Sequence, residues 1–282
     1  MPLQIIQEPA VEPLSLLEAK LHLRVDIPDD DALISALITS VRQYAETITR
    51  RAFIQQTWAY VIDSFPGPTL TGVPWGKTFT LPQHAIEIEK SRVQQVTAIN
   101  YLDMSGNLQV MPAANYIVDY SSEPCRITPV FGQIWPIPMP QIGACNVQFV
   151  AGYAAPVTFS GNTMAVQGTW RSYAVNESVQ LSNVGGLLPA ALAPNTNYFI
   201  QSVVSPGVYT LSASPGGPAI VLTDAGSGTS LIGVVPEGIK SWMKIRMTSL
   251  YEYRGDMVIP ERGKVEPLAY VDRLLDPYKV MF

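Results

Sequence analysis

PLSLLEAKLHLRVDIPDDDALISALITSVRQYAETITRRAFI, residues 13–54, carries the start and stop signals of two consecutive helices. Ser15 with Glu18 three residues later has the pattern of a capping box, so the first helix begins here. Residues 29–31 are three aspartates, and they place acceptors and negative charge where the second helix has free amides and the positive end of its dipole. The stretch therefore predicts a short helix followed by one of roughly five turns.

Each of the two helices has an apolar side, and we expect that of the second helix to be buried. In the first helix this side comprises Leu14, Leu17 and Leu21. In the second helix the apolar residues recur every three or four positions; they are Leu33, Ile34, Leu37, Ile38, Val41, Tyr44, Ala45 and Ile48. The polar residues of the second helix fall largely on the opposite side, where we expect solvent; they are Ser35, Thr39, Arg42, Gln43 and Glu46.

After these helices the hydrophobic period changes to two, which predicts strands. Trp58, Tyr60 and Ile62 alternate with more polar residues in the first of them, and further short strands are expected at 86–88, 93–102, 108–111, 116–120, 126–129 and 145–150. Residues 103–107, DMSGN, have the composition of a tight hairpin connection. The proline-rich stretch at 135–140 is expected to be an extended surface segment, because proline cannot donate ladder hydrogen bonds.

Composition changes sharply between residues 154 and 235. Residues 154–234 contain only three charged side chains, Arg171, Glu177 and Asp224, although 15% of the whole chain is charged. Short alternating runs separated by glycine, proline and asparagine are expected to form strands at 157–159, 164–166, 178–181, 198–204, 208–211 and 220–223. Helical signals then return at Pro236-Glu237 and at Pro267.

These patterns predict an α+β protein in two domains. A discontinuous domain of residues 1–153 and 236–282 would combine the helices with a small antiparallel sheet. Residues 154–235 would be an inserted all-β domain, either a sandwich or a barrel.

The sequence contains no catalytic or metal-binding pattern, and we expect no enzyme activity and no cofactor. The net charge of −5 argues against tight binding to nucleic acid, which draws its affinity from basic residues. No apolar run is long enough for a membrane helix and no secretion signal is visible, so we expect synthesis and folding in the cytoplasm. Cys125 and Cys145 could pair across a hairpin, but without a secretion signal buried reduced thiols are the favoured interpretation.

Several segments resemble the head-tail connector (head-completion adaptor) proteins of tailed bacteriophages. They are Glu12 to Val25 with Asp29 to Ile34, Thr57-Trp58, Val147 to Tyr153, Val235 to Lys240, and Leu274 to Val280. The usual member of that family joins Gly-Tyr almost directly to Val-Pro-Glu, so the insertion is a departure. Residues 187–200 and 224–229 are similar to β modules of phage tail and decoration proteins.

The resemblance implies a virion protein that forms a ring at the portal vertex, with twelve copies as the expected number. Its partners would be the same chain, the portal protein and a downstream neck or tail protein, with DNA passing through the lumen without sequence-specific binding. The insertion would brace the ring, contact the capsid or bind a ligand such as a glycan. A glycan-binding virion protein and a tail-tube or tail-terminator subunit are the alternatives.

A ring of identical subunits needs two different exposed patches on each copy. The candidates are aromatic or apolar residues in proline-rich loops, in the 257–266 loop and in the C-terminal tail; they are Trp75, Trp135, Met257, Val258, Ile259, Tyr278, Val280, Met281 and Phe282. For the two tryptophans, and for the tail, packing within the same chain is the competing interpretation.

Overall fold

The computed structural model describes residues 3–66, 85–194, 196–252, 271 and 273–280. Contacts divide the chain into two compact units, each with its own core. The first unit contains residues 1–8, 56–152 and 280–282, and the second contains residues 9–55 and 153–279. The predicted division into an outer domain and a 154–235 insertion, as independently folding parts, stays a prediction.

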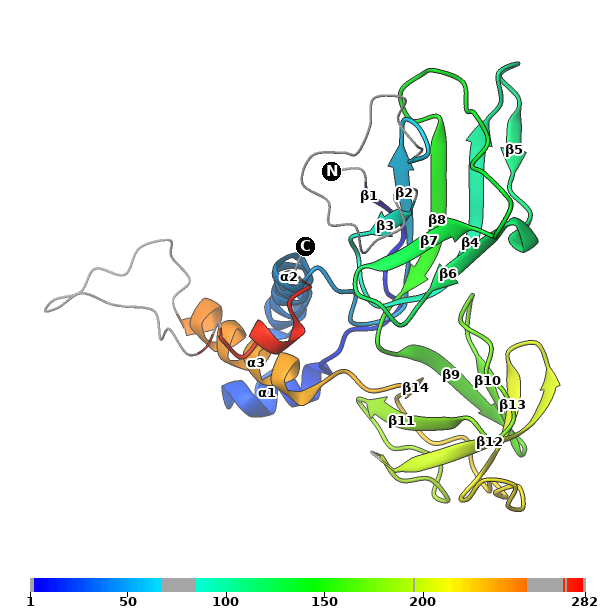
Figure 1. Cartoon of the computed structure of the whole chain (residues 1–282). Helices are drawn as coiled ribbons and strands as arrows, with labels where there is room; N and C mark the ends of the chain where they lie inside the picture. Colours follow the sequence, from blue (N-terminus) through cyan, green and yellow to red (C-terminus); the bar gives the residue numbers. More distant parts are fainter. Residues whose placement is uncertain (1–2, 67–84, 195, 253–270, 272, 281–282) are drawn as a thin grey trace, which may run out of the picture. The chain divides into compact units, whose positions relative to one another are not determined.

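The first unit is built from two antiparallel sheets. The larger sheet has the order β1-β2-β8-β4-β5 (Figure 1) and contains β1 (Leu3–Gln7), β2 (Gln56–Ile62), β8 (Cys145–Ala151), β4 (Val93–Leu102) and β5 (Leu108–Val110). The smaller sheet contains β3 (Ile86–Ile88), β7 (Cys125–Pro129) and β6 (Tyr116–Asp119), in that order. A 3-10 turn, Ala113–Asn115, precedes β6.

Alternation along the strands explains the core of this unit. In β8, Val147 and Phe149 are fully buried, whereas Asn146 and Gln148 between them are half-buried. The β4–β5 hairpin has the predicted turn, in which the Asp103 carboxylate accepts hydrogen bonds from the amides of Ser105 at 2.9 Å and Asn107 at 3.0 Å. Strand β1 was not expected from the sequence.

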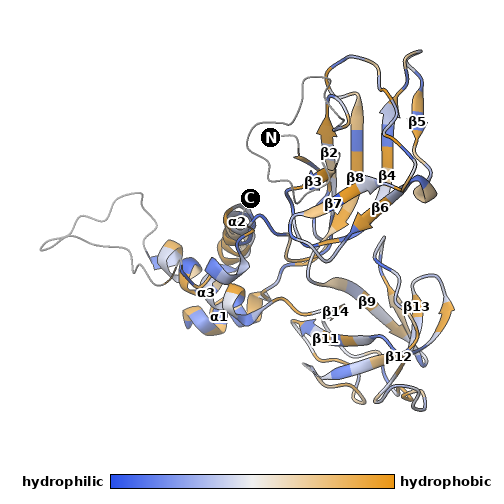
Figure 2. Cartoon of the chain, viewed as in Figure 1, coloured by the Kyte–Doolittle hydropathy of each residue, from blue (hydrophilic) through white to orange (hydrophobic). Residues whose placement is uncertain are grey.

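The second unit contains the helices, which are α1 (Leu16–Leu23), α2 (Asp31–Thr49) and α3 (Glu237–Glu252). The Ser15 hydroxyl accepts a hydrogen bond from the amide of Glu18 at 3.1 Å, so the predicted N-cap is confirmed. The carboxylate of Glu18 pairs with Lys244 of α3 at 2.6 Å. In Figure 2 the helices carry both apolar and polar residues, as expected for elements that bury one side.

The second unit also contains a closed barrel with the strand order β10-β13-β12-β11-β14-β9. Its strands are β9 (Ala155–Ser160), β10 (Thr163–Val166), β11 (Ser178–Val184), β12 (Asn197–Ser205), β13 (Val208–Ser212) and β14 (Thr229–Ile232). The sequence predicted either a sandwich or a barrel for the all-β segment, and the barrel is confirmed. The strand predicted at 220–223 is wrong, because the barrel is closed instead by β14, which pairs with both β11 and β9.

One hydrophobic cluster joins the helices and the base of the barrel. Its buried members come from α1, α2 and α3, from the segments before α1 and after α2, from the barrel and the residues next to it, and from the C-terminal part of the chain; they are Leu14, Ala19, Ile34, Ile38, Val41, Ala45, Phe53, Ile54, Ala154, Leu231, Val235, Ile239, Trp242, Met243, Met247, Val271 and Leu275. Trp242 is fully buried among them. The helices are therefore held against β14 by the same apolar contacts that hold them to one another.

The expected helix faces need correction at several positions. In α2, Leu33 and Tyr44 are exposed, whereas Arg42 and Glu46, expected in solvent, are buried. The physical reason is that the guanidinium of Arg42 pairs with the carboxylates of Glu46 and Glu12, so burial does not leave an unpaired charge. The helix expected from Pro267 lies largely outside the described residues.

Candidate interaction surfaces

The proline-rich segment between β7 and β8 is a long loop whose tryptophan faces inward. Trp135 is only 7% exposed, and its ring stacks on Phe65 with centroids 4.8 Å apart and planes 7° from parallel. Two hydrogen bonds hold the C-terminal half of the segment, from the Met139 amide to the Leu102 carbonyl at 2.8 Å and from the Gly143 amide to the Asp63 carboxylate at 2.8 Å. Trp135 therefore anchors the loop to its own unit.

The apolar neighbours of Trp135 point into solvent. Phe131, Ile134, Ile137 and Ile142 are all strongly exposed, and Phe131 is fully so. We call these four side chains and their backbone the 131–142 loop. Scattered exposed apolar residues are normal, but four large ones within twelve positions on an anchored backbone are typical of an interaction site.

A second exposed apolar surface lies on α1. Leu17 and Leu21 lie on one side of the helix, as predicted, and are 73% and 79% exposed. Leu14, which was predicted to share that side, precedes the helix and is buried, as is Ala19. The helix buries its other side because Ala19 allows a close approach to the cluster described above. A hollow of about 310 Å³ lies here and is lined by Leu16, Leu17, Lys20, Leu21, Val25 and Asp26; we call it the α1 hollow.

The described part of the C-terminal tail packs within the chain. Residues 276–278 form a short 3-10 turn, and the Tyr278 carbonyl accepts a hydrogen bond from Nε of Arg51. The Tyr278 ring packs against the helix cluster and lies beside Gly238, where an added Cβ would be 2.9 Å from the tyrosine hydroxyl. Val280 is buried. The other sequence-predicted contact residues, Trp75, Met257, Val258, Ile259, Met281 and Phe282, lie outside the described residues.

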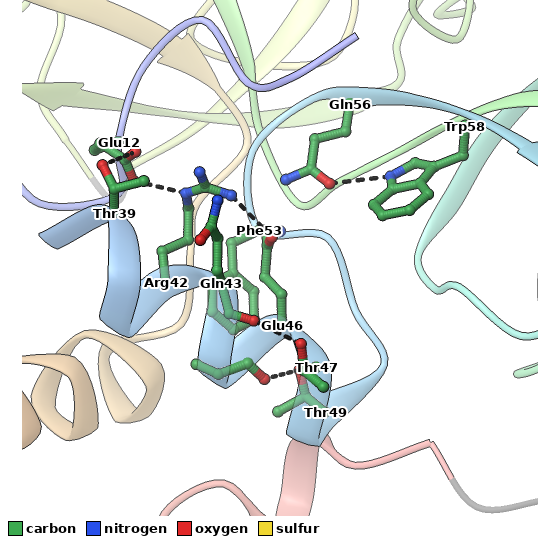
Figure 3. A network of polar contacts seen from close by, with 11 residues as sticks. Glu12, Thr39, Arg42, Gln43, Glu46, Thr47, Thr49, Phe53, Gln56 and Trp58 are labelled. Carbon is green, nitrogen blue, oxygen red and sulfur yellow. Dashed lines mark hydrogen bonds and ion pairs between the residues drawn. The ribbon is translucent and has the colours of Figure 1, made fainter. Parts of the chain in front are cut away.

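A buried polar network connects Glu12, before α1, to α2 and to the turn that follows it (Figure 3). Arg42, 3% exposed, donates from Nε to Glu12 at 2.7 Å and from Nη1 to Glu46 at 3.0 Å. The hydroxyl of Thr39 donates to Glu12 at 2.9 Å, and Glu46 accepts from the backbone amide of Phe53 at 2.8 Å. Burial by itself would lower the pKa of Arg42, but the charges of Glu46 and Glu12 and their hydrogen bonds raise it above its ordinary value. This network was not foreseen; the pairing of Arg42 with Glu46 at helical spacing was the available signal.

The described residues offer little for chemical catalysis. They contain no group of three or more metal-ligating side chains, and none of their helices is long and apolar enough to cross a membrane. A second hollow, of about 320 Å³, is lined by Tyr60, Glu87 and Glu89 among others. The pKa of Tyr60 is raised, mainly by burial and to a smaller extent by the negative charges of Glu89 and Glu87. Cys125 and Cys145 are free and buried, as expected, and burial raises their pKa values to about 12 and about 11.

Comparisons with known proteins agree with the connector resemblance. Residues 13–103 match the family model described as phage gp6-like head-tail connector protein. No curated protein sequence matches the chain. Solved structures share its fold, and for each of the three described next the match covers 100% of this chain and 97% of the other.

The three structures come from phage-like particles. One is described as the neck of an empty GTA particle computed with C6 symmetry, with a TM-score of 0.55 and 16% identity. Another is the virion of a native gene transfer agent particle, with a TM-score of 0.52 and 15% identity. The third is the neck of a native GTA particle computed with C12 symmetry, with a TM-score of 0.50 and 15% identity. The resemblance read from the sequence is thus confirmed for residues 13–103, which match the phage head-tail connector family.

Proposed function

We propose that this chain is a structural subunit of the neck of a phage-like particle, where a ring of copies joins the head to the tail and keeps packaged DNA in one continuous channel. The observation that carries the proposal is the connector-family match of residues 13–103, which covers α1, α2 and the strands from β2 to β4. The likeness in fold over the whole chain, barrel included, supports the same role.

The ring is homo-oligomeric, and we propose twelve copies. The C12 symmetry of one similar neck and the C6 symmetry of another are both compatible with that number. The partners in this proposal are the portal protein on the head side and a further neck or tail protein on the other side. The barrel would contact neighbouring subunits or the capsid. The subunits would be made in the host cytoplasm and would function in the virion.

The composition fits a channel through which DNA moves. Duplex DNA is retained by lysine and arginine side chains that displace counterions, and this chain has 18 Lys and Arg against 23 Asp and Glu. A ring with this charge would let DNA slide without sequence-specific contacts.

Residues outside the described part remain proposed contact sites. Trp75, Met257, Val258, Ile259, Met281 and Phe282 are apolar residues that we assign to contacts with the portal or the next neck protein. Trp135 contributes by holding the 131–142 loop in place. Tyr278 and Val280 would position the end of the tail.

The glycan-binding alternative has little support in the barrel. Protein sites for sugars use exposed aromatic rings as platforms, whereas Phe159, Trp170, Tyr173, Tyr198 and Tyr209 of the barrel are all buried. Trp170 and Tyr173 contact each other, because the indole N–H of Trp170 donates a hydrogen bond of 3.0 Å to the phenol oxygen of Tyr173.

Co-purification with the portal protein of the same particle tests the proposal. A complex of portal and this chain that survives gel filtration is expected, and the portal should not bind the barrel segment alone. A chain that binds immobilised glycans and never portal would instead support the glycan alternative. A chain that binds only tail-tube protein would support the tail alternative.

A further inference from the structure

We propose that the 131–142 loop of one subunit packs into the α1 hollow of the next subunit, so that these two surfaces form part of the contact that builds the ring. The inference rests on the proposed function because it needs a ring of identical subunits. It names the residues on both sides of the contact.

The 131–142 loop has the properties of a preformed protein contact. Its four exposed apolar side chains present on the order of several hundred Å² to solvent, which is the range of functional patches on monomers. The stacking of Trp135 on Phe65 and the hydrogen bonds of the Met139 and Gly143 amides anchor the loop at three points. Little ordering entropy is therefore lost when a partner covers these side chains.

The charge pattern restricts what the loop can bind. No Asp, Glu, Lys or Arg occurs between Arg126 and Arg171, so the loop and its surroundings in the sequence are uncharged. Such a surface has nothing with which to hold a phosphate backbone. It fits a mainly apolar protein surface, where little charge is stripped of water on binding.

The α1 hollow provides such a surface on the same chain. Leu16, Leu17, Leu21 and Val25 supply most of its lining. The charge of Lys20 is already compensated, because its ammonium group is 2.6 Å from Asp31 and 2.9 Å from the Ile27 carbonyl. A group entering the hollow therefore meets mostly apolar side chains, with Lys20 compensated and Asp26 as the other charged lining residue.

The sizes of the two surfaces match. An apolar cavity of about 150 Å³ holds a molecule the size of benzene. The α1 hollow, at about 310 Å³, is larger than that and so has room for the ring of Phe131.

A second copy is the favoured occupant because the two surfaces are different and belong to one chain. A closed ring needs a heterologous contact, in which one patch of each subunit meets an unlike patch of the next. A protruding loop and a hollow provide this pair. Two copies of the loop, or two copies of the hollow, would give a closed dimer instead.

Cysteine cross-linking in mixtures tests the pairing. Phe131→Cys and Leu21→Cys would be made in separate full-length chains. Each variant would be treated with a short bismaleimide by itself, and in a separate reaction the two variants would be mixed before the bismaleimide is added. Cys125 and Cys145 are buried with raised pKa values, so the background reaction should be low. Leu187→Cys, on an exposed leucine of the barrel, is the matched control for Phe131→Cys.

We expect cross-linked dimers in the mixture of Phe131→Cys with Leu21→Cys, and not with either variant alone or with the Leu187→Cys control. A chain carrying both substitutions should give a ladder of oligomers. Cross-linking of Phe131→Cys to itself would overturn the inference in favour of a two-fold contact. Cross-linking of Phe131→Cys to portal and not to Leu21→Cys would overturn it in favour of the portal as occupant.

A second variant separates this contact from folding. Ile134→Asp should weaken self-association, measured by sedimentation across a concentration series, by about tenfold or more, with the monomer melting temperature unchanged. Leu187→Asp should leave both quantities unchanged. Equal self-association of Ile134→Asp and the wild type would contradict the inference, as would a wild type that does not self-associate up to its solubility limit.

Failure of this inference is distinguishable from failure of the proposed function. Rings that form by electron microscopy and bind portal, but give no Phe131–Leu21 cross-link, would remove only the inference. A chain that neither forms rings nor binds portal would remove the proposed function.

Discussion

Nε of Arg42 lies 2.7 Å from Oε2 of Glu12, although the two residues are thirty positions apart in the chain. The same guanidinium reaches Glu46 one helical turn further along α2, and Glu46 in turn accepts from the amide of Phe53. One buried arginine therefore connects the segment before α1, the middle of α2 and the turn that leads out of it.

Replacing Arg42 by alanine should destabilise the helical unit by about 3–5 kcal/mol, because two carboxylates lose the charge that compensates their burial. The adjacent Gln43 is exposed, and Gln43→Ala should change the free energy of unfolding by about 0.5 kcal/mol or less. Urea denaturation followed by circular dichroism measures both. Similar midpoints for the two variants would show that the network does not stabilise the folded state.

Leu231→Ala should weaken the helices as well as the barrel. Leu231 lies in β14 and is almost fully buried in the cluster that contains Trp242 and Ile239 of α3. Truncation of a buried leucine costs about 2–5 kcal/mol. The melting temperature measured from the helical circular dichroism signal at 222 nm should fall together with the one measured from tryptophan fluorescence.

Leu222→Ala is the control for that experiment, since Leu222 is a buried barrel residue outside the shared cluster. It should destabilise the barrel with a smaller shift in helix melting. A Leu231→Ala variant whose helices melt at the wild-type temperature would contradict the shared core.

The two thiols should be unreactive in the native protein. Burial raises the pKa of Cys125 to about 12 and that of Cys145 to about 11, so both are protonated and covered at pH 8. Titration with a chromogenic disulfide reagent should give fast reaction of both thiols in urea and slow reaction without it. Rapid reaction of either thiol in the native protein would show that the core of the sheet unit opens readily.

Asp119→Asn should destabilise the protein at neutral pH and have a smaller effect in acid. Hydrogen bonds from Ser121 and Ser122 and the guanidinium of Arg126 hold the pKa of Asp119 well below its usual range. The stabilisation is therefore present above the ordinary Asp pKa of about 3.9 and is lost as the pH falls through the lowered folded-state value. Because the site is partly exposed, the melting temperature at pH 7 should drop by only about 2–4 °C. A difference from the wild type that is as large at pH 3 as at pH 7 would contradict this account.

Much of the secondary structure could be predicted because local signals agree with the fold. The Ser15 N-cap, the period of α2, the alternation of β4 and the Asp103 hairpin all depend on residues close in sequence. Strand β14 was missed because Thr229–Ile232 is short and follows a glycine-rich turn, and its place is set by partners in β9 and β11. The apolar run 220–223 looked more like a strand. Its first amide, of Ile220, bonds to the Leu211 carbonyl of β13 at 2.7 Å, but the run does not continue as a strand.

The interaction surfaces were harder to predict because exposure is decided by tertiary contacts. The proline-rich segment was predicted as a candidate contact region from its sequence. Its tryptophan, Trp135, stacks on Phe65, which is far away in the chain, whereas the isoleucines around Trp135 are exposed. In α1 the leucines at 17 and 21 form an apolar face by spacing alone. The packing of Ala19 against the other helices turned that face toward solvent.

A cryo-electron microscopy reconstruction of the neck of the particle that contains this chain tests the central claim most directly. The account predicts a ring of this chain between portal and tail, with helices and barrel both resolved and a continuous channel along the axis. Density for the chain on the capsid surface or in the tail fibres, with a different protein occupying the position below the portal, would contradict it.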